Sequence, residues 1–91
     1  MRVRRARRQP IGAIYITFGR TIRELRVRRG LSQEQLGLHS GGLHRNYVGA
    51  IERGEINPTL RTMLRLERGL DFALSEIVLL FDQRRHEGDR T

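Results

Sequence analysis

Residues 31–54 read LSQEQLGLHSGGLHRNYVGAIERG, and this stretch decides the fold. Ser32 followed three residues later by Gln35 is a capping box, a pattern that marks the first turn of a helix. Ser40-Gly41-Gly42 ends that helix after a short run, and a further helix follows until Gly54 stops it. Two short helices joined by a glycine-containing turn form the skeleton of a helix-turn-helix, although the pattern alone also fits an ordinary helical corner.

Upstream of this stretch, the apolar residues are spaced as on one face of a helix. Phe18, Ile22 and Leu25 lie at i, i+4 and i+7 and predict a buried stripe. Gly30 supplies the left-handed stop at the end of this first helix. Residues 14–18 alternate in the manner of a strand, although no partner strand is predicted; the alternative is that they simply lead into the first helix.

Two further helices are predicted downstream. Thr59 follows an Asn-Pro turn and is the expected N-cap of the fourth helix. The apolar side of that helix is expected to consist of Leu60, Met63, Leu64, Leu66 and Leu70. An apolar run at 77–81 predicts a fifth helix, from Leu74 to about Arg84. Five short helices with short connections and no convincing strand predict a compact all-α domain.

Length and composition exclude several classes of protein. Ninety-one residues suffice for one compact domain. The chain has no cysteine for disulfides or cysteine-ligated zinc, and its three scattered histidines suggest no metal site, so we expect neither metal nor cofactor. The longest apolar run is far too short to span a membrane, and no hydrophobic signal-peptide core follows the basic start. We therefore expect no membrane association and a cytoplasmic location.

Charge divides the chain into three expected regions. Five of the 18 arginines lie within the first eight residues, and without them the formal net charge falls from +8 to +3. Residues 1–13 are interpreted as a basic, flexible arm, residues 14–84 as a helix-turn-helix domain with its motif at about 32–54, and residues 85–91 as a flexible tail. Basic chains favour polyphosphate partners. The absence of lysine indicates either phosphate recognition or the codon bias of a GC-rich genome.

Three segments carry a resemblance to a known family: RGLSQEQL at 29–36, GLHRNYV at 42–48 and IERGEINPTL at 51–60. They resemble the Cro/repressor-type (XRE) helix-turn-helix family, over roughly residues 18–78. The length and the helix after Asn-Pro-Thr resemble, more weakly, the restriction–modification controller proteins. The resemblance implies a five-helix, lambda-repressor-like domain that binds double-stranded DNA and regulates transcription in the cytoplasm of a bacterium or phage host, on the nucleoid.

The resemblance also implies which residues meet DNA. The positions that match the base-reading turn are Arg45, Asn46, Gly49 and Ala50. Arginine pairs with guanine, asparagine pairs with adenine, and alanine packs on a thymine methyl group. The alternative for Arg45 is that it contacts only a phosphate. The positions that match backbone contacts are Gln33, His44, Tyr47, Arg53, Asn57, Thr59 and Arg61. Alternatives are a solvated Gln33, a helix-capping His44 and an Arg61 that reaches the minor groove.

The family pattern is also a guide to structural roles. Arg26 and Glu52 match a pair that in relatives joins the first helix to the end of the third. The turn carries one residue more than usual, which leaves the angle of the recognition helix open. Gly37 replaces the usual alanine and is expected to fit at a cost of about 1 kcal/mol of helix stability. Glu67 stands where a small residue is more common, and the sequence offers no explanation.

A single domain of this kind reads only a few base pairs, so relatives usually bind inverted repeats as two-fold dimers. The expected interface lies on the fifth helix and consists of Leu74, Ile77, Val78 and Phe81. The alternative is that this apolar run is simply the core of a monomer. The arginine arm is expected to wrap DNA or enter the minor groove, or else to add only nonspecific affinity.

The main functional hypothesis is a transcriptional regulator that binds a palindromic operator. Its alternative is the antitoxin half of a toxin–antitoxin pair, with a toxin as protein partner and the same fold used for autoregulation. An enzyme is not expected, because no carboxylate pair, nucleophile–base constellation or phosphate loop suggests a catalytic cleft. Glu52 and Asp71 are interpreted as structural or solvated residues.

Overall fold

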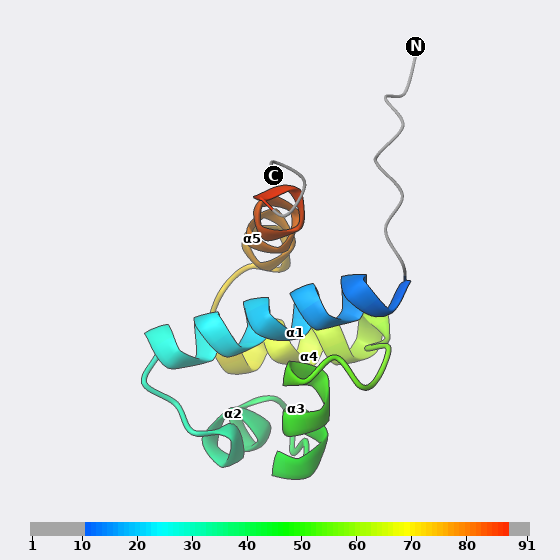
Figure 1. Ribbon diagram of the computed structural model, residues 1–91. Coiled ribbons are helices and arrows are strands. Elements are labelled where there is room, and N and C mark those ends of the chain that lie inside the picture. The colour runs from blue at the N-terminus through cyan, green and yellow to red at the C-terminus, as the bar shows by residue number, and fades with distance from the viewer. Residues whose placement is uncertain (1–10, 88–91) are drawn as a thin grey trace.

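The computed structural model describes residues 11–87, which form five helices. Figure 1 shows α2 and α3 on one side of α1 and α5 on the other, with α4 behind α1. The described part of the chain contains no strand, which confirms the predicted all-α fold. The helices are α1 (Ile11–Arg28), α2 (Gln33–His39), α3 (Arg45–Glu52), α4 (Leu60–Leu70) and α5 (Leu74–Glu87).

The first and last helices are longer than the sequence predicted. Helix α1 already begins at Ile11, so residues 14–18 are helical and the predicted arm overlaps the helix at residues 11–13. The hydroxyl of Thr17 donates to a carbonyl of the preceding turn, which satisfies this β-branched side chain within the helix. Helix α5 continues to Glu87, into the predicted tail. The rest of the predicted arm, residues 1–10, lies outside the described residues.

The core lies where all five helices meet. Phe18, Ile22 and Leu25 of α1 are buried as their spacing predicted. The other buried apolar side chains come from each remaining helix: Leu36, Val48, Ile51, Leu66, Leu70 and Ile77. Burial of each such side chain contributes about 1.5–3 kcal/mol of transfer free energy. None of the helices in residues 11–87 is long and apolar enough to cross a membrane.

Helix α4 is rotated relative to the prediction. Leu66 and Leu70 are buried, but Leu60 and Leu64 are exposed, although the periodicity placed all of them on one inner face. Thr62 and Gly69 are buried instead. Thr62 turns inward because its hydroxyl lies 3.3 Å from the Tyr47 hydroxyl of α3, and Gly69 because α2 approaches it closely.

Local capping signals are confirmed. The Ser32 hydroxyl accepts from the Gln35 amide at 3.0 Å, and the Gln35 side chain accepts from the Ser32 amide at 2.8 Å, which completes the predicted capping box. Thr59 accepts from the Thr62 amide at 3.1 Å and caps α4. Gly30 adopts a positive φ of 69° at the predicted stop.

The turn between α2 and α3 explains the unusual glycine of α2. Gly41 and Gly42 both have positive φ, and the carbonyl of Gly37 accepts from the amides of Gly42 (3.1 Å) and Leu43 (2.9 Å). A Cβ atom at position 37 would overlap the carbonyl oxygen of Leu43. Gly37 is therefore required by this turn and does not merely fit, as the sequence suggested.

A second close approach joins α2 to α4. Ser40, which ends α2, is fully buried, and a Cβ atom at Gly69 would overlap its hydroxyl oxygen. Within residues 11–87 the hydroxyl of Ser40 has no hydrogen-bond partner. Packing against a glycine, and not hydrogen bonding, fixes the end of α2 on α4.

The junction between α4 and α5 gives Glu67 a role that the sequence did not reveal. The Glu67 carboxylate accepts from the backbone amide of Leu74, the first residue of α5. Such an amide has no partner within its own helix, so Glu67 caps α5 from the preceding helix. Arg29 also holds this junction: it donates to the carbonyls of Leu70 and Asp71 and lies 3.9 Å from the centre of the Phe72 ring.

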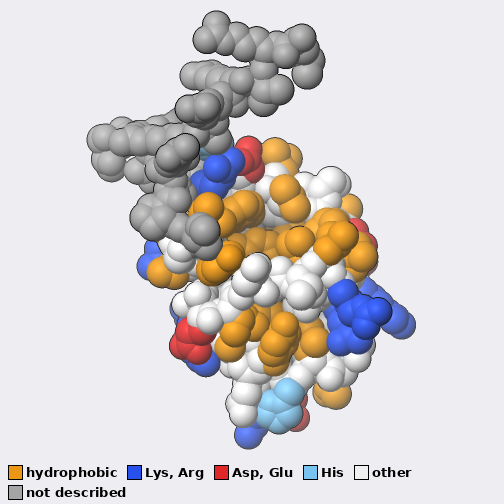
Figure 2. Space-filling model, turned by 90° about the vertical axis from the view of Figure 1, so that its right-hand side faces the viewer, with side chains coloured by type: hydrophobic (Ala, Val, Ile, Leu, Met, Phe, Trp, Pro, Cys, Tyr) orange, Lys and Arg blue, Asp and Glu red, His pale blue; other side chains and the backbone are white. Residues whose placement is uncertain are grey.

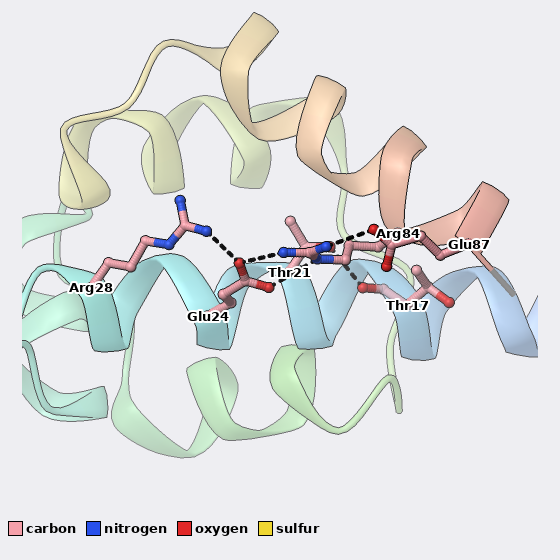
Figure 3. A network of polar contacts seen from close by, with 6 residues as sticks. All are labelled: Thr17, Thr21, Glu24, Arg28, Arg84 and Glu87. Atoms are coloured by element: carbon pink, nitrogen blue, oxygen red, sulfur yellow. Dashed lines mark hydrogen bonds and ion pairs between the residues drawn. The ribbon is translucent and has the colours of Figure 1, made fainter.

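Ionic contacts fasten α5 to α1 (Figure 3). Arg84 donates to both carboxylate oxygens of Glu24, at 3.1 and 2.9 Å, and also to Glu87 at 2.8 Å. Glu24 accepts in addition from Arg28, one turn further along α1. Hydrogen bonding from Arg84 lowers the pKa of the Glu24 carboxyl and, in turn, raises the pKa of Arg84. Helix α5 is thus held by charge at its C-terminal end as well as by its apolar residues.

Candidate DNA-binding surface

The first turn of α3 presents two polar side chains that make no interaction within the described chain. Arg45 and Asn46 are exposed, and neither side chain forms a hydrogen bond or ion pair with residues 11–87. His44 precedes them as the N-cap, with its Nδ1 accepting from the Asn46 amide at 3.0 Å. The cap fixes the backbone of this turn and leaves the donors and acceptors of Arg45 and Asn46 available to a ligand.

The other two predicted base-reading positions are less accessible. Gly49 is buried, because Arg53 and Gln33 cover it: a Cβ atom there would lie 2.9 Å from Nη1 of Arg53 and 3.5 Å from Oε1 of Gln33. The predicted base contact of Gly49 therefore requires that these two side chains move aside. Ala50 is half-buried. The accessible part of the recognition helix is its first turn.

An ion pair joins α1 to α3, as the family pattern predicted. Arg26 donates to Glu52 through Nε at 2.6 Å and through Nη2 at 3.0 Å, and its Nη1 donates to the carbonyl of Leu31 at 2.8 Å. The hydrogen bond to Glu52 raises the pKa of Arg26. The side chain of Glu52 is only 4% exposed. This pair fixes the direction in which α3 leaves the body of the molecule.

Two predicted phosphate contacts are engaged inside the protein. The Gln33 amide donates to Glu52 at 3.1 Å, which adds the start of α2 to the Arg26–Glu52 pair. Tyr47 packs against the core, and its hydroxyl lies 3.3 Å from that of Thr62. Both side chains are half-buried. In this structure they support the recognition helix.

The segment after α3 contains the remaining residues that were predicted to contact the DNA backbone, and all of these residues are exposed. Arg53 donates to both carboxylate oxygens of Glu55, at 2.7 and 3.2 Å, which lowers the pKa of Glu55. Thr59 is used in capping α4. Asn57 and Arg61 make no side-chain hydrogen bond within residues 11–87. Exposed polar groups therefore lie on both sides of α3 along the chain.

One positioning residue was missed in the sequence. Gly19 is buried in the middle of α1, and a Cβ atom there would overlap the carbonyl oxygen of Ile51 and lie 2.7 Å from that of Glu52. The last carbonyls of α3 therefore rest directly on the backbone of α1. A glycine in the interior of an otherwise regular helix was the available signal, because glycine there costs about 1 kcal/mol unless packing requires it.

The predicted dimer surface on α5 is only partly exposed. Ile77 is 1% exposed and belongs to the core of its own chain, so it is not available to a partner. Phe81 is half-buried, with its ring edge-on to Phe18 at 5.7 Å between centres. Val78 is 42% exposed and Leu79, which was not predicted, is 59% exposed. Leu74 is half-buried.

Comparisons with known proteins agree with this geometry. A helix-turn-helix family model matches residues 22–77, which include all of α2, α3 and α4. The chain is 42% identical to control protein C.SmaI of Serratia marcescens over 57 residues, which cover 63% of this chain and 67% of that protein. It is 34% identical to the uncharacterised HTH-type transcriptional regulator YgzD of Bacillus subtilis, over 68% of this chain and 92% of that one.

Solved structures give the same result. The restriction-modification controller protein C.AhdI from Aeromonas hydrophila is 46% identical, with a TM-score of 0.68, over 71% of this chain and 97% of that one. The controller protein C.Esp1396I superposes with a TM-score of 0.76 at 23% identity, which shows the fold alone. The chain therefore belongs to the Cro/repressor-type (XRE) helix-turn-helix family of DNA-binding transcriptional regulators.

Proposed function

We propose that this protein reads a specific sequence in double-stranded DNA through the first turn of α3. The observation that carries the proposal is the exposed, uncommitted pair Arg45 and Asn46, held in place by the His44 cap. Arginine and asparagine are the side chains that make bidentate contacts with guanine and adenine in the major groove. Each such contact contributes about 1–3 kcal/mol of discrimination between bases.

We propose further that the protein acts as a dimer on an inverted repeat. The exposed apolar side chains of α5, Val78 and Leu79, support this, because a partner would cover them. Two copies related by a two-fold axis would place two α3 helices in successive turns of the major groove. None of the relatives described above is named as an antitoxin, and no observation favours that alternative.

The regulated genes are proposed from the relatives. C.SmaI is named a control protein and C.AhdI a restriction-modification controller, and both exceed 40% identity to this chain. We therefore propose that this protein controls restriction–modification genes, with its operator close to its own promoter. A restriction endonuclease gene beside its own gene would support this assignment.

Selection of bound duplexes from a random DNA pool tests the proposal. We expect a two-fold-symmetric consensus; no enrichment would contradict sequence reading, and enrichment of a single unrepeated half-site would contradict the dimer.

On the selected site, Arg45→Ala should weaken binding by about 1–3 kcal/mol and relax the preference at one base position in each half. Gln33→Ala should weaken binding to all sequences similarly, because it removes the hydrogen bond from α2 to Glu52 that supports α3 and deletes no side chain that is placed to read a base. Titration of wild type and both variants against the selected duplex and its point variants measures these effects. An Arg45→Ala protein with full affinity and unchanged base preference would show that α3 does not read bases through this residue.

A further inference from the structure

Helix α4 carries three exposed arginines on one face: Arg61, Arg65 and Arg68, called here the α4 arginine strip. They are spaced at i, i+4 and i+7, so their side chains leave the helix in nearly the same direction. Figure 2 shows a cluster of arginine side chains, in blue, at one edge of the molecule. Only Arg61, at the start of the strip, was expected to meet DNA.

The α4 arginine strip differs from most other arginines of the described chain in having no counter-charge. None of its three side chains forms an ion pair or hydrogen bond within residues 11–87. The only acidic residue of α4 is Glu67, which is committed to the amide of Leu74. By contrast, six arginines in the same range are bound to carboxylates or carbonyls: Arg26, Arg28, Arg29, Arg53, Arg84 and Arg85.

The strip also lies beside the turn that leads into α3. The side chain of Arg65 runs along Gly41, with its Cγ, Cδ and Nε atoms each 3.9 Å from the place that a Cβ atom of residue 41 would occupy. Gly41 belongs to the turn four residues before Arg45. The middle of the strip is therefore next to the segment that presents the recognition helix, and Arg61 lies in the first turn of α4.

We propose that the α4 arginine strip binds phosphates of the DNA backbone next to the groove that α3 enters, a proposal that rests on the DNA-reading function above. From Arg61 to Arg68 the helix rises about 10 Å, which is comparable with the axial rise over three successive phosphate-to-phosphate steps of one strand. The strip extends the contact beyond the recognition helix and its following loop. Because phosphates are the same at every base pair, it adds affinity and register without base preference.

The same face of α4 also exposes Leu60 and Leu64, which is a feature of protein-binding surfaces. The uncompensated charge of the three arginines favours DNA over a protein partner, because arginines in contact with phosphates release the counterions condensed on DNA. A protein partner on this face would leave DNA affinity unchanged when the arginines are removed. The experiment below distinguishes the two occupants.

The test compares two double variants that remove the same charge. Arg65→Ala with Arg68→Ala removes two of the three arginines of the strip, and Arg20→Ala with Arg23→Ala removes two exposed, equally unpaired arginines from the outer face of α1. Dissociation constants are measured between about 50 and 200 mM salt on the selected operator duplex and on a scrambled duplex of equal length. Circular dichroism melts verify that both variants are folded.

We expect the strip variant to lose roughly two units of the slope of log K against log salt, about 0.9 for each phosphate contact, on both duplexes. Its preference for the operator over the scrambled duplex should stay at the wild-type value, and the α1 variant should retain the wild-type slope. Equal slope losses in both variants would show that net charge, and not the position of the arginines, determines the slope, and would overturn the proposal. An unchanged slope in the strip variant would overturn it as well.

A wild-type protein that does not prefer the operator refutes the proposed function instead, while the slopes on the scrambled duplex still test the strip.

Discussion

Glu52 is the residue on which the orientation of the recognition helix depends. Its carboxylate accepts from Arg26 of α1 and from Gln33 of α2 while itself belonging to α3, so one side chain joins three helices. A carboxylate that is almost fully removed from water is tolerated only when several donors compensate its lost hydration. Here two guanidinium nitrogens and one amide nitrogen do so.

Glu52→Ala should therefore lower the free energy of unfolding by about 3 kcal/mol, because it leaves the Arg26 guanidinium half-buried without its partner. Urea unfolding at neutral pH measures the loss. Glu55→Ala is the matched control: it removes a carboxylate from the exposed pair with Arg53 and should cost at most about 1 kcal/mol. Equal losses in the two variants would show that the buried pair contributes no more than a surface one.

At the scale of elements, α3 is held at both ends by backbone-to-backbone contacts through glycine. Leu43, just before α3, rests on Gly37 of α2, and the last carbonyls of α3 rest on Gly19 of α1. Such contacts leave no room for adjustment, because the atoms on the other side belong to the backbone. They set the position of the reading turn more rigidly than flexible side chains would.

Two glycines of α1 make a paired test. Gly19→Ala should destabilise the fold by about 1–3 kcal/mol or more, because its methyl group would displace the end of α3. Gly12→Ala should be neutral or stabilise by up to about 1 kcal/mol, since nothing lies within 4 Å of the added methyl and alanine favours the helix. Thermal unfolding of both variants provides the measurement. Stabilisation by both would show that α1 and α3 are not in close contact.

The attachment of α5 to α1 should depend on pH through Glu24. Because Arg84 lowers the pKa of Glu24 in the folded protein, the pair stabilises fully above the ordinary glutamate pKa of about 4.3. That stabilisation is lost as the pH falls through the lowered value, where Glu24 becomes protonated. Wild type should therefore melt higher than Glu24→Gln at pH 7 and lose this advantage in strong acid, as seen in thermal melts across the range. A difference that is constant with pH would contradict the ionic origin.

The elements that local sequence determines were predictable. The capping box at Ser32 and the cap at Thr59 use residues within one turn, so their spacing is visible in the chain. The rotation of α4 was not predictable, because it depends on the contact of Thr62 with Tyr47, 15 residues away. The role of Glu67 as a cap for α5 escaped notice for the same reason: its partner lies in the next helix.

At the scale of the whole molecule, the proposed dimer is supported by the exposed apolar side chains of α5. Replacing Val78 and Leu79 by Ser should shift the protein towards monomer, because the two exposed side chains would no longer be buried between copies. Val27→Ser is the control, since Val27 is 60% exposed on α1. Sedimentation velocity over a range of concentrations measures the effect. An unchanged dimer in the α5 variant would place the interface elsewhere.

The candidate site was predictable at the level of elements more than of single residues. The first turn of α3 and the Arg26–Glu52 pair followed from the family pattern, and the structure contains both. Gly49 and Ile77 are less accessible than their positions on the helices indicated, because a helical wheel gives the direction of a side chain but not which residues cover it. Arg53 lies over Gly49, and the core of the same chain takes up Ile77.

The contact between Gly37 and Leu43 has a consequence for which residues the turn accepts. The chain departs from its family in two ways at this point, with a longer turn and with glycine in place of alanine. An alanine methyl at position 37 would overlap the Leu43 carbonyl that the longer turn brings against α2. Alanine at position 37 therefore requires the turn to move, so the glycine and the course of the turn are coupled in this chain.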